Sequence, residues 1–526
     1  MNTSISFQNI DSIPQMIKDF LNQTLEGMEL YIFNLKNIEN HIVVKQKTFA
    51  LEQRQVLCQV LERQMKGINI SELQNENLIK LAKENTFTIT TGHQLNLFTG
   101  PVFFIYKILQ TIKTTVFLKE KFPQYHFVPI FWMATEDHDF EEIHHFKTPN
   151  RYYEMRGQAG GAVGRIPVEE QTFITQFEEA FKDTIYGTEL LRWMKDAYQK
   201  GKTLAEATRL LVNYLFSEYG LLILDGDDRD LKQRMIPIFK EELLHQSLFK
   251  TTQPQIEILQ NRYGKVQVNP RDINLFYLSE TRNRIEYDAG RYKTVEASFQ
   301  WTEEALVQEL EAYPERFSPN ALMRPVYQEW VLPNLAYIGG NAEMMYWIEL
   351  KDYFKYLNLA FPILIPRNSM LFLNEKTFRK MEKLGFSVED FFRNFAKVIE
   401  ERLLSNSDIS LLLADKEQEL KQIFTEIQTA SEQTDVTFRN LVKAEEVRQL
   451  KAFQRMKKRL LRAEKRKHQE EIERIEHLFN EIHPGKNWQE RVYNFSTFYA
   501  DYGKGWLQSC YNAIDVEKSE LNIQKL

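Results

Sequence analysis

Three carboxylates and an imidazole occupy four consecutive positions, Glu136 to Asp139, within the stretch FWMATEDHDFEE. Charged groups packed this closely repel each other unless a cation, an amine or a helix N-terminus compensates them. Carboxylates such as Asp137 can orient the amines or sugar hydroxyls of a substrate, and His138 or Glu136 can accept a proton from an amine. Two other interpretations stay open. One is a metal held by His138 and an acid, and the other is helix capping, which accounts for only one of these side chains.

A second polar group, TTGHQ, occupies residues 90–94. Its first four residues fit the T/H-x-G-H pattern of class I nucleotidyltransferases and aminoacyl-tRNA synthetases. In that pattern the glycine admits the nucleotide, and the histidine stabilises charge that develops on the α-phosphate. The candidate ligands of a nucleotide or substrate here are Thr91, Gly92, His93 and Gln94.

Two later stretches are further candidates for binding phosphates. A pair of glycines precedes a predicted helix in LAYIGGNAEMMYW, and backbone N–H groups at a helix N-terminus can bind an anion. An ordinary loop is the alternative. The segment PRNSM takes the place of the second phosphate-contacting motif of the same fold, although the usual lysine-rich form is missing. These candidates are Gly339, Gly340, Asn341, Glu343, Arg367 and Ser369.

The segments around the two polar groups predict alternating strands and helices. Residues 87–92 and 126–135 read as buried strands, and residues 101–122 between them read as an amphipathic helix. Two apolar strands joined by a crossover helix imply a parallel sheet, which binds ligands beyond the carboxyl ends of its strands. Residues 219–228 and 359–370 predict further strands. The TTGHQ and EDHD groups are therefore expected to face one crevice.

The amino-acid composition of the chain changes near residue 385. Between Gly385 and Pro484 there is no glycine or proline, and the stretch is dense in Glu, Lys, Arg, Gln and Leu, which predicts helix. A heptad seam with a polar middle runs through Leu420, Phe424, Ile427, Ser431, Thr434, Phe438 and Leu441. We expect a helical hairpin or coiled coil that makes a homodimer. Its basic run, 451–467, reads as the solvated face of a coiled coil, with phosphate contact as the alternative.

Composition excludes several classes of protein. The 526 residues carry a net charge of −6, which disfavours a dedicated nucleic-acid binder. Only two cysteines are present, Cys58 and Cys510, so neither a disulfide framework nor a cysteine zinc site is expected. There is no apolar run of about 18 residues and no signal-like N-terminus, so we expect a soluble cytoplasmic protein without membrane contact.

Four stretches in the same order carry a family resemblance: TTGHQLNLFTGPVFFIYK, PIFWMATEDHDFEEI, NLFYLSETRNRIE and RPVYQEWVLPNLAYIGGNAEMMYWIELKDYF. With the helical segment behind them they resemble the cysteine-adding enzymes of bacillithiol synthesis, the BshC family, over roughly residues 85–480. The resemblance implies a Rossmann-type core with inserted segments and a coiled-coil homodimer. It also implies a ligase reaction in the last step of bacillithiol synthesis, which joins the carboxyl of cysteine to the amine of glucosaminyl malate.

The working hypothesis assigns roles to the candidate residues. Because an amide does not form spontaneously from a free carboxylate in water, the carboxyl must first be activated, and we expect ATP with Mg²⁺ to do this. His93, Gln94, Arg367 and the backbone near Gly339, Gly340 and Asn341 would hold phosphates or the activated carboxyl. Relatives commonly have Gln in place of His93, which favours hydrogen bonding over proton transfer there. Asp137 and Asp139 would orient amines, and His138 or Glu136 would take a proton. Arg282 and Arg284 would bind the malate carboxylates, with a salt-bridged strand edge as the alternative.

We therefore expect an α/β protein with a Rossmann-like parallel-sheet core, inserted connective segments and a long α-helical coiled-coil domain. The predicted divisions are residues 1–150 for N-terminal helices and the first half of the core, 151–218 for an insertion, 219–374 for the rest of the core, 375–484 for the coiled coil and 485–526 for a tail that packs on the core. The N-terminal helices are expected around 12–36 and 47–66. Two other functions stay open: a class I nucleotidyltransferase or aminoacyl-tRNA-synthetase-like enzyme with another substrate, and a non-catalytic scaffold.

Overall fold

The structure, a computed structural model, describes residues 3–157, 160–295, 299–405 and 408–526. The chain divides into two compact units. The first, which we call the core unit, comprises Met1–Gln8, Ile13–Phe372 and Asn487–Gln524. The second, the helical unit, comprises Asn9–Ser12, Leu373–Lys486 and Lys525–Leu526.

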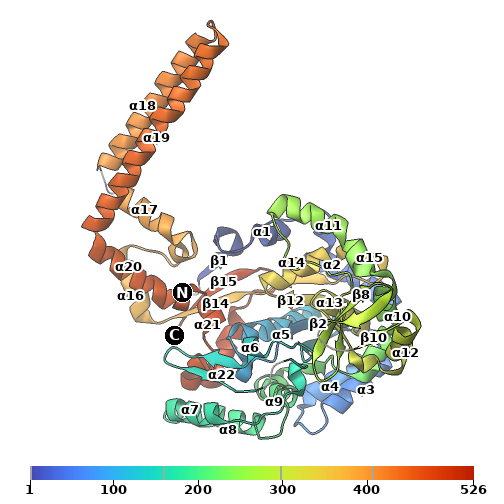
Figure 1. Cartoon of the computed structure of the whole chain (residues 1–526). Coiled ribbons are helices and arrows are strands. Elements are labelled where there is room, and N and C mark those ends of the chain that lie inside the picture. Colours follow the sequence, from blue (N-terminus) through green and yellow to red (C-terminus); the bar gives the residue numbers. More distant parts are fainter. Residues whose placement is uncertain (1–2, 158–159, 296–298, 406–407) are drawn as a thin grey trace. The chain divides into compact units, whose positions relative to one another are not determined.

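A five-stranded parallel sheet forms the centre of the core unit (Figure 1). Its strands, in spatial order, are β13 (Ile363–Pro366), β12 (Asn334–Gly339), β2 (Thr86–His93), β3 (His126–Met133) and β6 (Leu222–Asp225). Every neighbouring pair runs parallel. The strands are buried and rich in β-branched and aromatic residues, as expected for a sheet covered on both faces. The predicted Rossmann-like core is confirmed.

Helix α5 (Phe103–Lys121) is the crossover between β2 and β3, and it packs against both strands. Phe87 and Ile89 of β2 bury their side chains against Leu118 of α5 and Ile38 of α2 (Leu35–Thr48). Each such buried side chain stabilises the fold by about 1.5–3 kcal/mol. The other helices before β2 are α1 (Gln15–Leu21), α3 (Leu51–Gln64) and α4 (Glu72–Leu81).

The predicted N-terminal helix over residues 12–36 is wrong in its second half. Helix α1 ends at Leu21, and no α-helix resumes until Leu35. Gln23 and Gly27 between them have left-handed φ angles of 59° and 75°, which an α-helix cannot accommodate. The residues between the two helices therefore form turns and a short 3₁₀ helix, Glu29–Tyr31.

Two long insertions interrupt the sheet. The first, between β3 and β6, contains α6 (Phe140–Ile143), β4 (His145–Lys147), β5 (Tyr152–Glu154), α7 (Thr172–Phe181), α8 (Gly187–Ala197) and α9 (Leu204–Phe216). The second, between β6 and β12, contains α10 (Arg229–His245), α11 (Ser247–Tyr263), β7 (Leu275–Leu278), β8 (Arg282–Asp288), β9 (Arg291–Thr294), β10 (Gln300–Trp301), α12 (Glu303–Ala312), β11 (Phe317–Pro319) and α13 (Met323–Val331). Its strands form an antiparallel sheet of order β10-β9-β8-β7-β11.

After β12 the core unit continues with α14 (Asn341–Glu349) and α15 (Lys351–Tyr356). A third sheet joins β1 (Thr3–Ser6), β15 (Glu520–Lys525) and β14 (Ser369–Leu373). The C-terminal helices α21 (Gln489–Val492) and α22 (Ser496–Ala513) return to the core unit. Trp506 and Tyr499 of α22 are buried in the same apolar cluster as helices of the first insertion.

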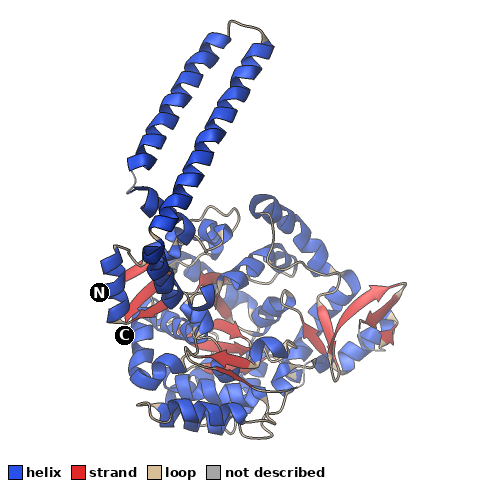
Figure 2. Cartoon of the chain, turned by 60° about the vertical axis from the view of Figure 1, so that its left-hand side comes forward, coloured by secondary structure: helices blue, strands red, loops and turns tan. Residues whose placement is uncertain are grey.

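The helical unit contains α16 (Glu375–Leu384), α17 (Phe395–Ser405), α18 (Asp408–Ser431), α19 (Val436–Lys467) and α20 (Gln469–Ile482). Helices α18 and α19 lie side by side as a long hairpin (Figures 1 and 2). The predicted coiled-coil domain is confirmed. The predicted seam is only partly right, because Phe424 and Ser431 are buried whereas Phe438 and Leu441 are 44% and 55% exposed. Val442, one position along, faces inward instead.

A buried ion pair ties α21 to the end of the central sheet. Arg367 follows β13, and its Nη1 and Nη2 donate to Glu490 Oε2 and Oε1 at 3.0 and 2.6 Å. Ser369 Oγ and the Met370 N–H donate to the same carboxylate, each at 3.1 Å. Both charged side chains are less than 5% exposed. Neither group therefore has water to replace a lost partner.

Replacing Arg367 by Met should strongly destabilise the core unit, because Glu490 would be left as a buried charge without its cation. We expect the free energy of unfolding, measured by urea denaturation, to fall by about 3–5 kcal/mol. Lys504→Ala is the control, since Lys504 pairs with Glu218 at the exposed surface and should change stability by less than about 1 kcal/mol. Equal effects of the two substitutions would contradict this interpretation.

Candidate functional site

A cavity of about 770 Å³ lies at the carboxyl ends of β2 and β3 in the core unit. This volume suits a small-molecule ligand. The cavity wall includes the residues that follow both strands, the side of α5, the start of α14 and several residues of the second insertion. The crevice that the strand order predicts therefore exists, and the second insertion closes it.

The structure brings some of the predicted site residues together and not others. Those that line the cavity are Gly92, His93, Gln94, Glu136, Asp137, His138, Arg282 and Glu343. Those outside its lining are Thr91, Asp139, Gly339, Gly340, Asn341, Arg367 and Ser369.

The residues outside the lining have structural partners instead. Thr91 Oγ1 donates to the carbonyl of Ile338 at 2.7 Å. Asp139 is the N-cap of α6 and accepts from the Glu142 N–H at 3.1 Å. The Gly340 N–H donates to Glu343 Oε2 at 2.7 Å, so it is not open to an anion. Arg367 and Ser369 belong to the Glu490 ion pair described above.

The TTGHQ end of the cavity carries a neutral histidine. The ring of His93 packs against Phe103 and Phe104, with its centroid 5.2 and 5.1 Å from theirs. Burial and the nearby Lys107 ammonium lower the pKa of His93 to about 4. Its Nδ1 lies 3.0 Å from the Gln94 carbonyl oxygen and therefore holds the proton, which leaves Nε2 as an acceptor.

Asp137 is an ionised acid at the carboxyl end of β3. Gln94 Nε2 donates to its Oδ2 at 2.8 Å, and the backbone N–H of His138 donates to its Oδ1 at 2.7 Å. Burial alone would raise the pKa of Asp137, but these contacts with His138 and Gln94, together with the Arg282 guanidinium, hold the pKa well below its usual range. A fixed negative charge in a cavity suits the binding of an ammonium group.

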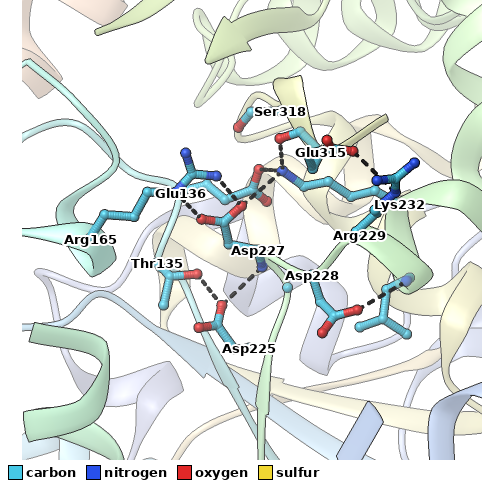
Figure 3. Close-up of polar contacts among 12 residues, drawn as sticks. Thr135, Glu136, Arg165, Asp225, Asp227, Asp228, Arg229, Lys232, Glu315 and Ser318 are labelled. Atoms are coloured by element: carbon cyan, nitrogen blue, oxygen red, sulfur yellow. Dashed lines mark hydrogen bonds and ion pairs between the residues drawn. The ribbon is translucent and has the colours of Figure 1, made fainter. Parts of the chain in front are cut away.

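Glu136 differs from its neighbour in the chain. It is 8% exposed and lines the cavity, and its Oε1 lies 2.6 Å from the buried Nζ of Lys232 (Figure 3). Burial raises the pKa of Glu136, the Lys232 ammonium opposes that rise, and the neighbouring Asp227 adds to it. A carboxylate whose pKa is raised toward neutrality is better suited to accept a proton than Asp137 is.

Arg282 and His138 hold each other in place. Nη1 of Arg282 donates to His138 Nδ1 at 3.1 Å, and its Nε and Nη2 donate to Ser318 Oγ at 3.1 Å and the Pro319 carbonyl at 2.7 Å. The guanidinium also lies over the ring of Phe276, 4.1 Å from the centroid. Because Nδ1 of His138 already accepts a hydrogen bond, that nitrogen is not free to take a proton from a substrate.

A network that no sequence motif indicated joins α5, β2, β12 and α14 beside the cavity. Lys107 Nζ donates to the Gly92 carbonyl at 2.5 Å and to Glu343 Oε2 at 2.7 Å, and Tyr337 Oη donates to Glu343 Oε1 at 2.6 Å. Burial would raise the pKa of Glu343, but the Lys107 ammonium outweighs it and lowers the pKa to about 2. Lys107 lies among apolar residues in PVFFIYKILQ, and this isolation of a charge on a buried helix was the available signal.

Two further arginines, Arg271 and Arg284, line the cavity. Neither the Arg271 nor the Arg284 guanidinium donates a hydrogen bond or forms an ion pair among the residues that the structure describes. Arg324, which also lines the cavity, instead donates to Tyr346 Oη at 3.2 Å and to Gln328 Oε1 at 3.1 Å.

Within the described ranges, no three His, Cys, Asp or Glu side chains are grouped to hold a metal ion.

Comparison with known proteins decides the family. Residues 1–368 match the family of bacillithiol biosynthesis BshC, N-terminal Rossmann-like domain, and residues 370–526 match bacillithiol biosynthesis BshC, C-terminal coiled-coil domain. The chain belongs to the BshC family. The resemblance that the sequence motifs indicated is confirmed.

Several BshC proteins align along nearly the whole chain. The protein from Flavobacterium johnsoniae is 41% identical over 504 residues, which cover 95% of each chain. The protein from Christiangramia forsetii is 40% identical over 530 residues, covering 99% of this chain and 98% of the relative. That from Cytophaga hutchinsonii is 33% identical over 516 residues, covering 97% and 96%. Each is named "Putative cysteine ligase BshC".

Among the described residues of this BshC chain, no helix has the length and apolar character needed to span a membrane.

The lowered pKa of His93 predicts a pH dependence of stability. The unfolded histidine takes up a proton near pH 6.5 and the folded one only near pH 4, so this contribution to stability is present above pH 6.5 and is lost as the pH falls toward 4. His93→Gln should remove that contribution. We expect urea unfolding to show a smaller loss of stability between pH 7 and pH 5 in the variant than in the wild type. An equal loss in both proteins would show that His93 is not held neutral.

Proposed function

We propose that this protein is a cysteine ligase of bacillithiol synthesis that joins the carboxyl of cysteine to the amine of glucosaminyl malate. The observation that carries the proposal is the pairing, in one cavity, of an ionised acid with an acid of raised pKa, Asp137 and Glu136. An amine acceptor needs both functions, because it arrives as an ammonium ion and must lose protons before it can attack. The names of the BshC relatives support the same reaction class.

The bond-forming step is an acyl transfer. The lone pair of the amine attacks the carbonyl carbon of an activated cysteine carboxyl, the C–N bond forms, and the leaving group departs with the electrons of the C–O bond. The nitrogen loses two protons in all: the ammonium form gives one to solvent, which exposes the lone pair, and the second leaves as the C–N bond forms, with Glu136 as its proposed acceptor. Asp137 holds the ammonium near it beforehand, which turns an encounter in solution into a reaction between positioned groups.

The activating agent that we propose is ATP with Mg²⁺, but the residues first predicted to hold its phosphates do not fit that role. Arg367 is committed to Glu490, and the Gly340 N–H is committed to Glu343. Neither residue lines the cavity. The proposed mechanism therefore assigns no step to phosphate contacts, and the nucleotide products must be measured directly.

The malyl group of the acceptor carries two carboxylates, and we place them at Arg271 and Arg284. The sequence indicated Arg282 and Arg284 for this role, but the guanidinium of Arg282 is held by Ser318, Pro319 and His138. Guanidinium groups pair with carboxylates through charge-assisted hydrogen bonds, often two at once. Arg271 and Arg284 line the cavity, and their guanidinium groups donate no hydrogen bond to a described residue.

Dimerisation through the helical hairpin completes the proposal. Ile423, Ile427, Phe438 and Leu441 of α18 and α19 are each 40% or more exposed. Apolar side chains gathered on a helical surface indicate a surface that another chain covers. A second copy of this chain is the partner we propose.

The reaction is tested by mixing the purified full-length chain with cysteine, glucosaminyl malate and ATP-Mg²⁺ and following products by mass spectrometry. We expect a thiol product whose mass equals the two substrates minus water. AMP would indicate an adenylated carboxyl, and ADP would indicate an acyl phosphate. Absence of the thiol product would contradict the proposed function.

Variants at the acidic stretch sharpen this test. Asp137→Asn and Glu136→Gln should each lower kcat/KM by about 100-fold or more, because they remove the fixed charge and the proton acceptor. Asp139→Asn is the matched control, since Asp139 caps α6 outside the cavity lining and should retain most activity. Near-normal rates for the first two variants, with an unchanged circular dichroism spectrum, would remove both acids from the mechanism.

The proposed carboxylate contacts predict a specific effect on the acceptor. Arg284→Ala and Arg271→Ala should each raise KM for glucosaminyl malate by about 10- to 100-fold, since each removes a hydrogen bond to a charged group. Arg291→Ala, at an exposed position of β9 outside the cavity lining, is the control and should leave KM unchanged. With glucosamine as the acceptor, which lacks the malyl carboxylates, the variants and the wild type should behave alike. A defect of the same size with glucosamine would argue against carboxylate recognition.

A further inference from the structure

Lys232 is a fully buried lysine that lies next to the cavity wall without lining it. It belongs to α10, and its side chain has no exposed surface. Its Nζ lies 2.6 Å from Glu136 Oε1 and 3.1 Å from Asp227 Oδ1, and it donates to the Glu315 carbonyl at 3.1 Å (Figure 3). Two hydrogen bonds, to Asp227 and to the Glu315 carbonyl, and the ion pair with Glu136 therefore fix the position of the ammonium group.

The two carboxylates that Lys232 joins differ in their other partners. Asp227 also accepts from Arg165, whose Nε and Nη2 donate to its two oxygens at 2.7 and 2.8 Å. The Arg165 side chain is half exposed and supplies Asp227 with a second cation. No described residue besides Lys232 forms an ion pair with Glu136. The charge on Lys232 is therefore the main compensation for the one carboxylate of this group that lines the cavity.

We propose that Lys232 is a positioning residue, which holds the Glu136 carboxylate at the cavity wall in the ionised form that can take a proton from the attacking amine. This inference rests on the proposed function. Lys232 cannot touch the substrate, because Glu136 separates it from the cavity. It acts only through the orientation and charge of its partner.

Other charged and titratable groups around Glu136 also influence its pKa. Asp227 follows β6, Arg165 comes from the first insertion, Arg282 is on β8 and the Tyr327 hydroxyl is on α13. Asp227 disfavours the ionised form of Glu136, whereas Arg282 and Arg165 favour it. Tyr327 Oη donates to the Gly226 carbonyl at 2.7 Å and stays neutral, because burial raises its pKa.

The arrangement gives two substitutions with opposite expected effects. Lys232→Met removes the cation, so Glu136 would hold its proton to higher pH, and the acid limb of the pH profile of kcat/KM should move up by about one pH unit or more. Asp227→Asn removes the competing carboxylate and leaves Lys232 to Glu136, so the acid limb should move down. Lys232→Arg keeps the charge and should restore part of the wild-type profile. A purely structural role for Lys232 would lower the melting temperature without moving the acid limb in opposite directions.

The experiment measures kcat/KM from pH 5 to pH 9 for the full-length wild type and the three variants, with Lys240→Met as the control. Lys240 lies on the same helix and pairs with Glu311 at the surface, so its substitution should not move the profile. Acid limbs that coincide in all variants would overturn the inference. If Lys232→Met does not fold, the downward shift with Asp227→Asn and the result with Lys232→Arg still decide it.

A second readout separates this inference from the proposed function. If the wild type makes no thiol product, the proposed function fails, and the pairing can still be tested through urea unfolding of Lys232→Met, Glu136→Gln and the double variant. We expect the double variant to lose much less stability than the sum of the two single losses, because the first substitution already removes the shared interaction. Additive losses would overturn the pairing.

Discussion

The flush parallel pairing of β2 with β3 is the constraint on which the site depends. Gly92 pairs with Trp132 and His93 with Met133, so the two strands end at the same level of the sheet. The residues that follow each strand are therefore neighbours, and the hydrogen bond from Gln94 to Asp137 joins them directly. A shift of register by one residue would turn the side chains of a strand to the other face and separate these groups.

The cations paired with buried carboxylates determine which of these acids can contact a substrate or exchange a proton. Glu343 is held by Lys107 and Glu490 by Arg367, and neither can leave its cation without a large free-energy cost. Asp137 and Glu136 share the cavity but differ in pKa, because hydrogen bonds stabilise the charge on one and burial opposes the charge on the other. Neighbouring carboxyls with separated pKa values are the usual basis for dividing binding from proton transfer.

The second inserted segment, and not the sheet alone, forms the wall of the cavity. The sheet is common to many α/β proteins and does not define an activity by itself. The second insertion contributes Arg271, Arg284 and the anchored Arg282 to the cavity, and α10 of the same insertion contributes Lys232 to its support. The residues proposed to recognise the acceptor and the lysine proposed to position the base therefore come from one stretch of chain, between β6 and β12.

The sequence by itself determined the parallel core, the long helical hairpin, the family and the position of the EDHD and TGHQ groups, because each depends on local periodicity or a local motif. Only the tertiary structure decided which charges meet. Arg367 was predicted to bind phosphate and instead pairs with Glu490, more than a hundred positions away. Lys107 and Lys232 belong to no recognisable functional motif. Their carboxylate partners, Glu343 and Glu136, are far away in the sequence, and a buried lysine needs such a partner because an unpaired buried charge is costly. Such pairings depend on the packing of remote segments, which no local pattern in the chain encodes.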